Sequence, residues 1–194
     1  MFKQIINGRI LTPSGWLEGG SVVIEGNKIK EVSNCDLPLK DAEIIDAKGN
    51  YVVPGGIELH VHGGGGRDFM EGTEEAFRTA VEAHMQHGTT AIYPTMSCST
   101  PEMYEQGIAV TKKLMAEPDS PIMGLHLEGP YFSLKMAGAQ RPEWITPPNP
   151  ADYNRMLESG IIKRWDIAPE LEGAEEFIKA CREAGCVPCI GHTA

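Results

Sequence analysis

The stretch Tyr51-Val52-Val53-Pro54-Gly55-Gly56-Ile57-Glu58-Leu59-His60-Val61-His62-Gly63-Gly64-Gly65-Gly66 decides how the rest of the chain is interpreted. Its first part, residues 51–57, is an apolar run with turn residues and predicts a buried strand. Side chains two positions apart on a strand point the same way, so His60 and His62 are expected to project together from its end. Two neutral imidazoles can bind one divalent metal ion, and the glycines leave space beside it. The alternative is a pair of core histidines before a flexible turn.

Composition places the chain among ordinary globular proteins. It has 194 residues, 41% hydrophobic and 23% charged, which is enough for one domain or slightly more. The formal net charge of −10 argues against general binding to nucleic acid or anionic membranes, but leaves room for a phosphorylated small molecule. We see no targeting segment and no membrane span. Five cysteines without a framework spacing favour a reducing, cytoplasmic compartment. The Cys186-x-x-Cys189 pair is interpreted as buried strand thiols rather than as a zinc or redox site.

Residues 1–53 are predicted to form a small antiparallel β module. Short apolar segments at 4–7 and 9–11 flank Gly8, and those at 21–25 and 28–32 flank the hairpin turn Gly26-Asn27. Two further strands are expected at 43–46 and 51–53. Strands this short bury little surface alone, so we expect a supporting role beside a larger domain.

From residue 54 the pattern alternates between strand and helix. Thr73 and Thr100 are expected N-caps of helices, and Gly88 is expected to close the first of them. Near-continuous apolar strands separated by helices are typical of a parallel sheet covered by helices. We count about five such strands, including the first; the other four are expected at residues 89–93, 121–128, 161–168 and 187–192. A closed (β/α)8 barrel needs eight strands and about 250 residues, so we expect the front portion of a larger enzyme.

Metal-ligand residue types stand at the carboxyl ends of three of these strands. They are His60 and His62 on the first, Glu128 on the third and His192 on the fifth. Chemistry in a barrel sits at that end, so these four side chains are expected to hold a metal. His126 lies one layer deeper than Glu128 and is open to three interpretations: support of a ligand, core packing, or direct ligation. His84 and His87, on a helix and near its end, are interpreted as structural.

Four motifs carry a resemblance to a known family. They are residues 54–62, the segment Gly124-Leu125-His126-Leu127-Glu128-Gly129-Pro130-Tyr131-Phe132, the loop triplet Gly138-Ala139-Gln140, and Gly191-His192-Thr193. The first resembles the opening barrel strand of the amidohydrolase superfamily. The others are more specific, and with them the chain resembles the N-acetylglucosamine-6-phosphate deacetylase family along its whole length.

The resemblance implies a fold and a set of site residues. The fold is a (β/α)8 barrel, of which residues 54–194 would be the first part, with a small β-sandwich domain to which residues 1–53 would contribute. Glu128 and His192 match metal ligands, and His60 and His62 match the pair that holds a second ion in two-metal members. One or two divalent ions are therefore implied, and Zn, Fe, Mn or Co all suit these ligands. Ala139 and Gln140 match a substrate-contacting position.

The resemblance also implies an activity, the deacetylation of N-acetyl-D-glucosamine 6-phosphate in amino-sugar catabolism, and a homodimer. A further metal-binding histidine and the general-base aspartate are expected beyond Ala194, so no catalytic residue is assigned within the chain. The 194-residue piece alone is expected to be inactive. Two alternatives stay open: another amidohydrolase acting on a related N-acetyl sugar or a cyclic amide, and a truncated noncatalytic fragment.

Overall fold

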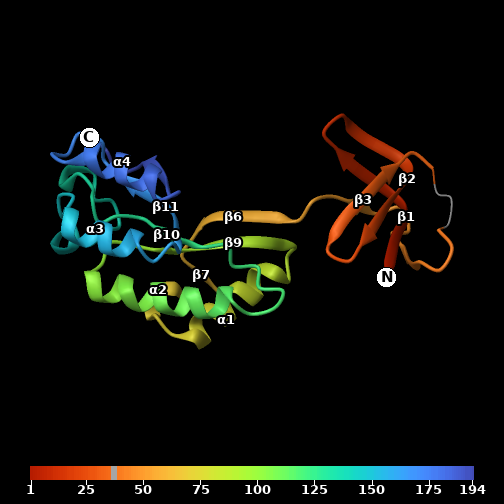
Figure 1. Cartoon of the computed structure of the whole chain (residues 1–194), viewed down its shortest axis with the longest axis horizontal. Coiled ribbons are helices and arrows are strands. Elements are labelled where there is room, and N and C mark those ends of the chain that lie inside the picture. Colours follow the sequence, from red (N-terminus) through yellow and green to blue (C-terminus); the bar gives the residue numbers. More distant parts are fainter. Residues whose placement is uncertain (36–38) are drawn as a thin grey trace. The chain divides into compact units, whose positions relative to one another are not determined.

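The computed structural model describes residues 1–35 and 39–194. The chain divides into two compact units, Met1–Pro54 and Gly55–Ala194 (Figure 1). None of the described helices is long and apolar enough to cross a membrane.

The first unit is one five-stranded sheet. Its strands are β1 (Phe2–Thr12), β2 (Gly15–Glu25), β3 (Lys28–Ser33), β4 (Glu43–Asp46) and β5 (Tyr51–Val52), in the order β3-β2-β1-β4 with β5 also paired to β1. The predicted turn at Gly26-Asn27 joins β2 to β3. The two segments predicted around Gly8 form one strand with a bulge, where Asn7 has a φ of 56° and the register shifts.

The antiparallel prediction for this unit is only half right. β2 runs antiparallel to β1 and to β3, but β4 and β5 run parallel to β1, with Ile5 opposite Ile45 and Arg9 opposite Tyr51. The reason is topological: β4 lies across β1 from β2, so no tight turn between consecutive strands sets its direction. Much apolar surface of this sheet stays exposed, including Ile29, Val32 and Ile44.

The predicted buried strand over residues 51–57 is wrong. The run is divided at Val53-Pro54-Gly55: β5 belongs to the first unit, and β6 (Gly56–Val61) opens the second. Pro54 has no N–H to offer a ladder, which favours the interruption. The apolar side chains on either side, Tyr51 and Ile57, are exposed.

The second unit alternates strands and helices as predicted. After β6 come the short strands β7 (Gly63–Gly64) and β8 (Arg67–Asp68), then α1 (Glu74–Met85), β9 (Thr89–Met96), α2 (Pro101–Met115), β10 (Leu125–Leu127), α3 (Pro150–Leu157), β11 (Ile162–Ile167), α4 (Ala174–Glu183) and β12 (Val187–Ile190). Single 3-10 turns occur at Phe69–Glu71, Leu134–Met136 and Pro142–Trp144. The hydroxyls of Thr73 and Thr100 cap α1 and α2, as expected.

Five strands of this unit form a curled parallel sheet in the order β12-β11-β10-β9-β6. β10 is shorter than the predicted strand because Gly124 has a φ of 152°, outside the extended region of ordinary residues. Before it, Ile122 keeps only a single bridge to Ile92. The parallel order places the carboxyl ends of all five strands along one rim.

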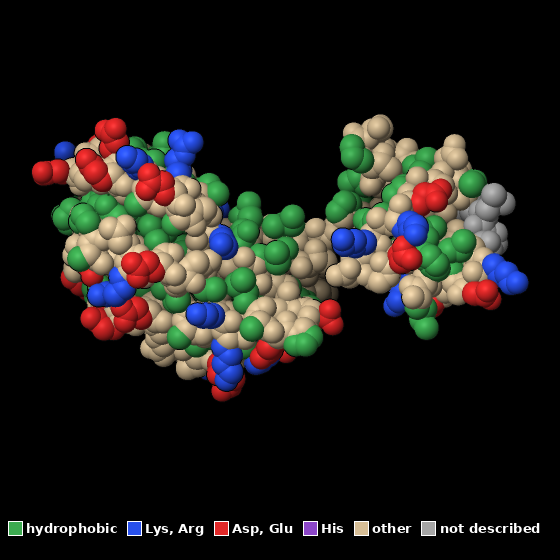
Figure 2. Space-filling view, viewed as in Figure 1, with side chains coloured by type: hydrophobic (Ala, Val, Ile, Leu, Met, Phe, Trp, Pro, Cys, Tyr) green, Lys and Arg blue, Asp and Glu red, His purple; other side chains and the backbone are tan. Residues whose placement is uncertain are grey.

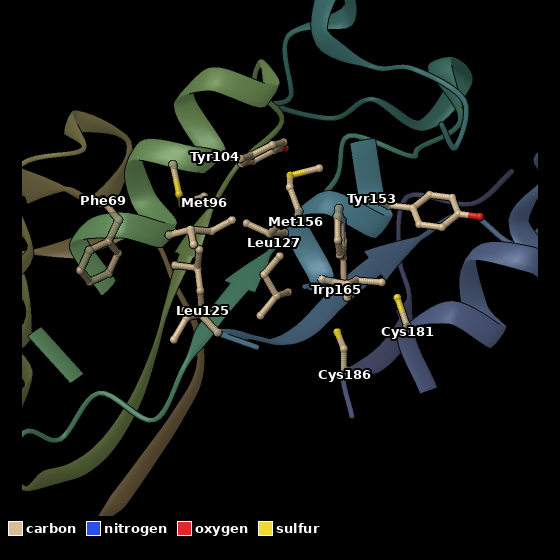
Figure 3. Close-up of a cluster of buried hydrophobic side chains, with 14 of the residues drawn as sticks. Phe69, Met96, Tyr104, Leu125, Leu127, Tyr153, Met156, Trp165, Cys181 and Cys186 are labelled. Atoms are coloured by element: carbon tan, nitrogen blue, oxygen red, sulfur yellow. The ribbon is translucent and has the colours of Figure 1, made fainter. Parts of the chain in front are cut away.

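One face of the sheet packs against all four helices. Figure 3 shows part of this core, in which Leu127 and Trp165 of the sheet meet Tyr153 of α3 and Cys181 of α4. The Trp165 indole stacks on the Tyr131 ring, with centroids 5.7 Å apart. Because side chains alternate along a strand, the opposite face carries the other set, which includes Thr95, His126 and Asp166.

The surface of the second unit has two features that bear on its assembly. Ile57 and Leu59 on β6, and Val187 and Ile190 on β12, are exposed at the two edges of the sheet. In the view of Figure 2, acidic and basic side chains of this unit are interspersed among the described residues without a continuous basic patch.

Candidate metal centre

Three predicted ligands converge at the carboxyl rim of the sheet. The Nε2 atom of His60 lies 3.4 Å from Oε1 of Glu128, and Nε2 of His62 lies 3.3 Å from Oε2 of the same carboxylate. The two Nε2 atoms are 3.2 Å apart. One ligand atom from each of the three residues fits within a group no wider than 4.8 Å. Residues 68 positions apart along the chain thus meet because β6, β9 and β10 are neighbours in the parallel sheet.

Glu128 is fixed by the strand before it and the turn after it. Its N–H donates to the backbone oxygen of Met96 at 2.8 Å, which continues the pairing of β10 with β9 by one residue. The next residue, Gly129, has a φ of 106°, and a Cβ there would lie 2.3 Å from Sγ of Cys98. A larger residue therefore does not fit, and the glycine lets the chain turn directly behind the carboxylate.

His192 joins the group through Glu128. Its Nε2 lies 3.4 Å from Oε1 of Glu128, while its Nδ1 lies 2.8 Å from the backbone oxygen of Met136. A carbonyl only accepts, so Nδ1 carries the proton and Nε2 is left with its lone pair facing the carboxylate. The imidazole also stacks on Phe132 at 4.3 Å between ring centroids. Within the described part of the chain, Glu128 is the one member of the rim group that His192 contacts.

The electrostatics of the group are set by burial and by these short contacts. Burial alone would raise the pKa of Glu128, but the hydrogen bond from His62, the charge of His60 and His62 and the short contact with His192 lower it to about 2. The hydrogen bond to Glu128 raises the pKa of His62, whereas burial lowers the pKa of His60. For His62 the hydrogen bond with the carboxylate outweighs the effect of burial on the pKa, whereas for His60 burial is the largest effect.

Gln140 lies against the carboxylate. Its Nε2 donates to Oε2 of Glu128 at 2.6 Å, and its Oε1 accepts from the N–H of Cys98 at 2.9 Å. Together with Ala139 it also lines a pocket of about 350 Å³ beside the rim. The other lining residues come from the 3-10 turn Phe69–Glu71, the segment between β9 and α2, α2 itself and the loop after β10: Met70, Ser97, Cys98, Met103, Arg141 and Trp144.

His126 is fully buried one layer below Glu128. Its Nδ1 lies 3.1 Å from Oγ1 of Thr95, and its Nε2 lies 3.1 Å from Oδ1 of Asp166. One ligand atom each from His60, His126 and Asp166 also lies within 4.8 Å of the others, so direct ligation remains geometrically open. Sequence reasoning missed Asp166. The signal was an acid inside the otherwise apolar end of β11, between Trp165 and Ile167.

The remaining histidines and cysteines lie outside the rim group. Nε2 of His84, on α1, donates to the backbone oxygen of Gly63 at 2.9 Å, which is a structural contact. Cys186, just before β12, is buried, and Cys189, on β12, is half-buried. In the described residues no group of three metal-ligand side chains includes a cysteine.

The donor set suits a divalent cation. Three imidazole nitrogens surround one buried carboxylate, and two of the nitrogens are only 3.2 Å apart, a spacing typical of ligands of a shared ion. Nitrogen and oxygen donors of this kind suit Zn, Fe, Mn and Co.

The class of protein follows from comparing the sequence with known families, together with the geometry of the rim. The amidohydrolase family matches residues 51–192, which include all four rim residues, and the chain belongs to that family. Members of this family use divalent metal ions.

Individual relatives are more specific. The chain is 29% identical to the N-acetylglucosamine-6-phosphate deacetylase of Haemophilus influenzae, over 100% of this chain and 51% of that protein. It is 29% identical to that of Bacillus subtilis, over 95% of this chain and 48% of that protein. The human deacetylase is 26% identical, over 96% of this chain and 46% of its own length. The chain therefore spans about half the length of the curated relatives it matches.

Solved structures agree with this. The N-acetylglucosamine-6-phosphate deacetylase of Pasteurella multocida superposes with a TM-score of 0.92 at 27% identity, covering 100% of this chain and 51% of that one. The Mycobacterium smegmatis enzyme gives 0.89 at 29% identity, covering 98% of this chain and 50% of that one. A mutant of the Mycobacterium smegmatis enzyme in complex with N-acetyl-D-glucosamine-6-phosphate gives 0.87 at 28% identity, covering 99% and 50%.

Proposed function

We propose that the protein carrying this chain is a metal-dependent hydrolase that converts N-acetyl-D-glucosamine 6-phosphate to D-glucosamine 6-phosphate and acetate, in amino-sugar catabolism. The observation that carries the proposal is the convergence of His60, His62 and His192 on the single carboxylate of Glu128. The similarity to deacetylases over almost the whole chain supports the choice of substrate.

The four rim residues are assigned as ligands of one or two divalent ions. Glu128 faces His60 and His62 with its two carboxylate oxygens and His192 with one of them, so these four residues together would hold the ion or ions. When bound, such an ion lowers the pKa of water and polarises the acetamide carbonyl. Neighbouring groups orient the ligand nitrogens. The backbone oxygen of Met136 fixes the tautomer of His192, and Oγ of Ser97, 3.2 Å from Nδ1 of His62, restricts the rotation of that ring.

Ala139 and Gln140 are assigned to substrate contact, because the pocket they line opens beside the carboxylate. The guanidinium of Arg141 borders the same pocket and lies 4.6 Å from the centre of the Trp144 ring. Its charge suits an anionic sugar phosphate. The general base is assigned to an aspartate outside the 194 residues.

Three further assignments complete the proposal. Residues 1–53 contribute to a small β-sandwich domain, which the exposed apolar surface of their sheet supports, and residues 54–194 form the first part of a (β/α)8 barrel. β6 and β12 are the edge strands of the sheet and carry exposed apolar side chains, which suits them to pairing with further strands that would cover those side chains. The protein is a cytoplasmic homodimer without nucleic-acid or membrane partners, in keeping with five free cysteines and an acidic balance.

The test measures acetate release by the intact protein from N-acetyl-D-glucosamine 6-phosphate and from unphosphorylated N-acetylglucosamine, and ring opening of a cyclic amide such as hydantoin, which carries no acetyl group. We expect the sugar phosphate to be preferred and a chelator to abolish the reaction. Glu128→Gln is expected to lose metal and activity, whereas Glu105→Gln, which removes an exposed pair with Arg155 between helices, keeps both.

Three kinds of result would overturn the proposal. Preference for the cyclic amide or indifference to the phosphate would assign the rim to another amidohydrolase reaction. Unchanged metal content in Glu128→Gln would remove the rim group as the metal centre. If metal binds but no substrate is hydrolysed, the chain is part of a noncatalytic protein.

A further inference from the structure

Four polar side chains cross the face of the sheet opposite the helices, directly below the rim. Thr95, His126, Asp166 and Arg164 come from β9, β10 and β11, and the first three are buried. Thr95 Oγ1 lies 3.1 Å from Nδ1 of His126, Nε2 of His126 lies 3.1 Å from Oδ1 of Asp166, and that oxygen lies 3.6 Å from Nε of Arg164. They form a continuous row, which we refer to as the inner row.

Both ends of the inner row bind the backbone of β6. At one end, Thr95 Oγ1 accepts from the N–H of Val61 at 2.8 Å. At the other end, Nη1 of Arg164 donates to the backbone oxygen of Leu59 at 3.1 Å. These two backbone groups belong to the residues on either side of His60. The row therefore hydrogen-bonds to β6 at the point where the side chains of the predicted ligands project from the strand.

Ordinary sheet pairing is interrupted at the same place. The register of β6 against β9 shifts between Glu58 and Val61, and Val61 stands opposite Pro94. At this irregularity the hydroxyl of Thr95 accepts from the N–H of Val61, which ties β6 to β9 through a side chain next to His60.

The inner row also contacts His60 itself. The imidazoles of His60 and His126 meet edge to face, with ring centroids 4.8 Å apart. His126 lies between Thr95 and Asp166 and is fully buried, so its ring is fixed in place. Packing against it restricts the orientation of the His60 ring.

One detail of the row invites a different interpretation. Nε2 of His126 and Oδ1 of Asp166 are close, but their directions do not satisfy a hydrogen bond, and neither atom makes one elsewhere in the described residues. An ion between His60, His126 and Asp166 would use both atoms. The guanidinium of Arg164 argues against it, because that charge already faces the same carboxylate oxygen.

We propose that the inner row is a positioning device: Thr95, His126, Asp166 and Arg164 hold residues 59–61 so that His60 and His62 present their nitrogens to the ion. This inference rests on the proposed metal centre, but not on the substrate. Groups that orient metal ligands typically change metal affinity about 10- to 100-fold when removed.

The experiment compares three threonine variants of the intact protein. Thr95→Val replaces the hydroxyl with a methyl group of similar size, and Thr95→Ser keeps the hydroxyl but removes the methyl group. Thr111→Val is the matched control, because Thr111 is also fully buried but its hydroxyl has no partner in the described residues. The measurements are the metal dissociation constant by competition with a chelator, the number of ions bound, and the melting temperature.

We expect Thr95→Val to bind metal about 10- to 100-fold more weakly, with Thr95→Ser close to the parent protein and Thr111→Val unchanged in affinity. Arg164→Met tests the other end of the row and is expected to weaken binding similarly, which keeps the inference testable if Thr95→Val does not fold. Asp166→Asn is expected to bind as many ions as the parent.

Unchanged affinity in both Thr95→Val and Arg164→Met would overturn the inference, as would failure of Thr95→Ser to restore binding. Loss of one ion in Asp166→Asn would make Asp166 a ligand rather than a positioning residue. None of these results depends on acetate release, so they are independent of whether the proposed substrate is correct.

Discussion

Nδ1 of His192 lies 2.8 Å from the backbone oxygen of Met136, although 56 residues separate them in the chain. The contact joins the end of the fifth strand of the parallel sheet to the long loop after the third. It sets the tautomer of His192 and turns Nε2 toward Glu128. The loop thus controls the orientation of one predicted ligand.

Gly138→Ala is expected to disturb that control. Gly138 has a φ of 59°, and a Cβ there would lie 3.4 Å from Cε1 of His192. The left-handed backbone costs an alanine about 1 kcal/mol, and relief of the strain moves the loop that holds His192. We expect a loss of about 1 kcal/mol in unfolding free energy and about tenfold weaker metal binding, measured by denaturation and chelator competition.

Gly160→Ala is the control for this change. Gly160 has a φ of 66°, but a Cβ there meets nothing within 4 Å, and it lies after α3. It should lose similar stability without losing metal affinity. Equal affinity loss in both variants would mean that backbone strain, not the position of His192, is responsible.

Gln140→Leu is expected to affect both stability and metal binding. The amide donates to Glu128 and accepts from the N–H of Cys98, so leucine leaves that N–H without its acceptor. A buried unsatisfied group costs about 1–3 kcal/mol, and the loosened carboxylate should bind metal about tenfold more weakly. Gln106→Leu removes a hydrogen bond from the Gln106 amide to the backbone oxygen of Gly72, which involves none of the four rim residues, and should reduce stability alone. Unaltered metal affinity in Gln140→Leu would show that Glu128 is oriented without it.

Trp165→Phe is expected to destabilise the second unit. The indole is fully buried and donates to the backbone oxygen of Gly129 at 2.7 Å. Phenylalanine leaves that carbonyl unpaired and the space partly empty, for a loss of about 2–4 kcal/mol in urea unfolding. Trp16→Phe, at a side chain that is 49% exposed, should change stability by no more than about 0.5 kcal/mol. Equal effects at the two sites would contradict the assigned core.

The cysteines are expected to differ sharply in reactivity. Burial, together with the nearby charge of Glu128, raises the pKa of Cys98 to about 12, so its thiol stays protonated when the pH is raised from 7 to 10. Cys35 is exposed. An uncharged alkylating reagent followed by peptide mass mapping should label Cys35 throughout this range and Cys98 only after unfolding. Labelling of Cys98 in the native protein at pH 8 would show that the turn behind Glu128 opens.

Local patterns in the sequence were enough for much of this protein. The helices capped by Thr73 and Thr100 and the alternation of strands with helices follow from periodicity and capping, which act over a few residues. The positions of His60, His62, Glu128 and His192 at strand ends follow from the same local patterns, since parallel strands bring their carboxyl ends to one rim.

Pairing between distant segments decided the rest. β4 and β5 run parallel to β1, and the apolar run at 51–57 is split between two units, because sheet partners are chosen over long separations that local patterns do not encode. The inner row depends on register: His126 stands opposite Arg164 only because pairing of β10 with β11 shifts after Leu125. The residue types needed to bind an ion are thus fixed by the sequence itself. Which buried groups hold those ligands is fixed by tertiary structure, because a one-residue change in strand register exchanges the two faces of a strand.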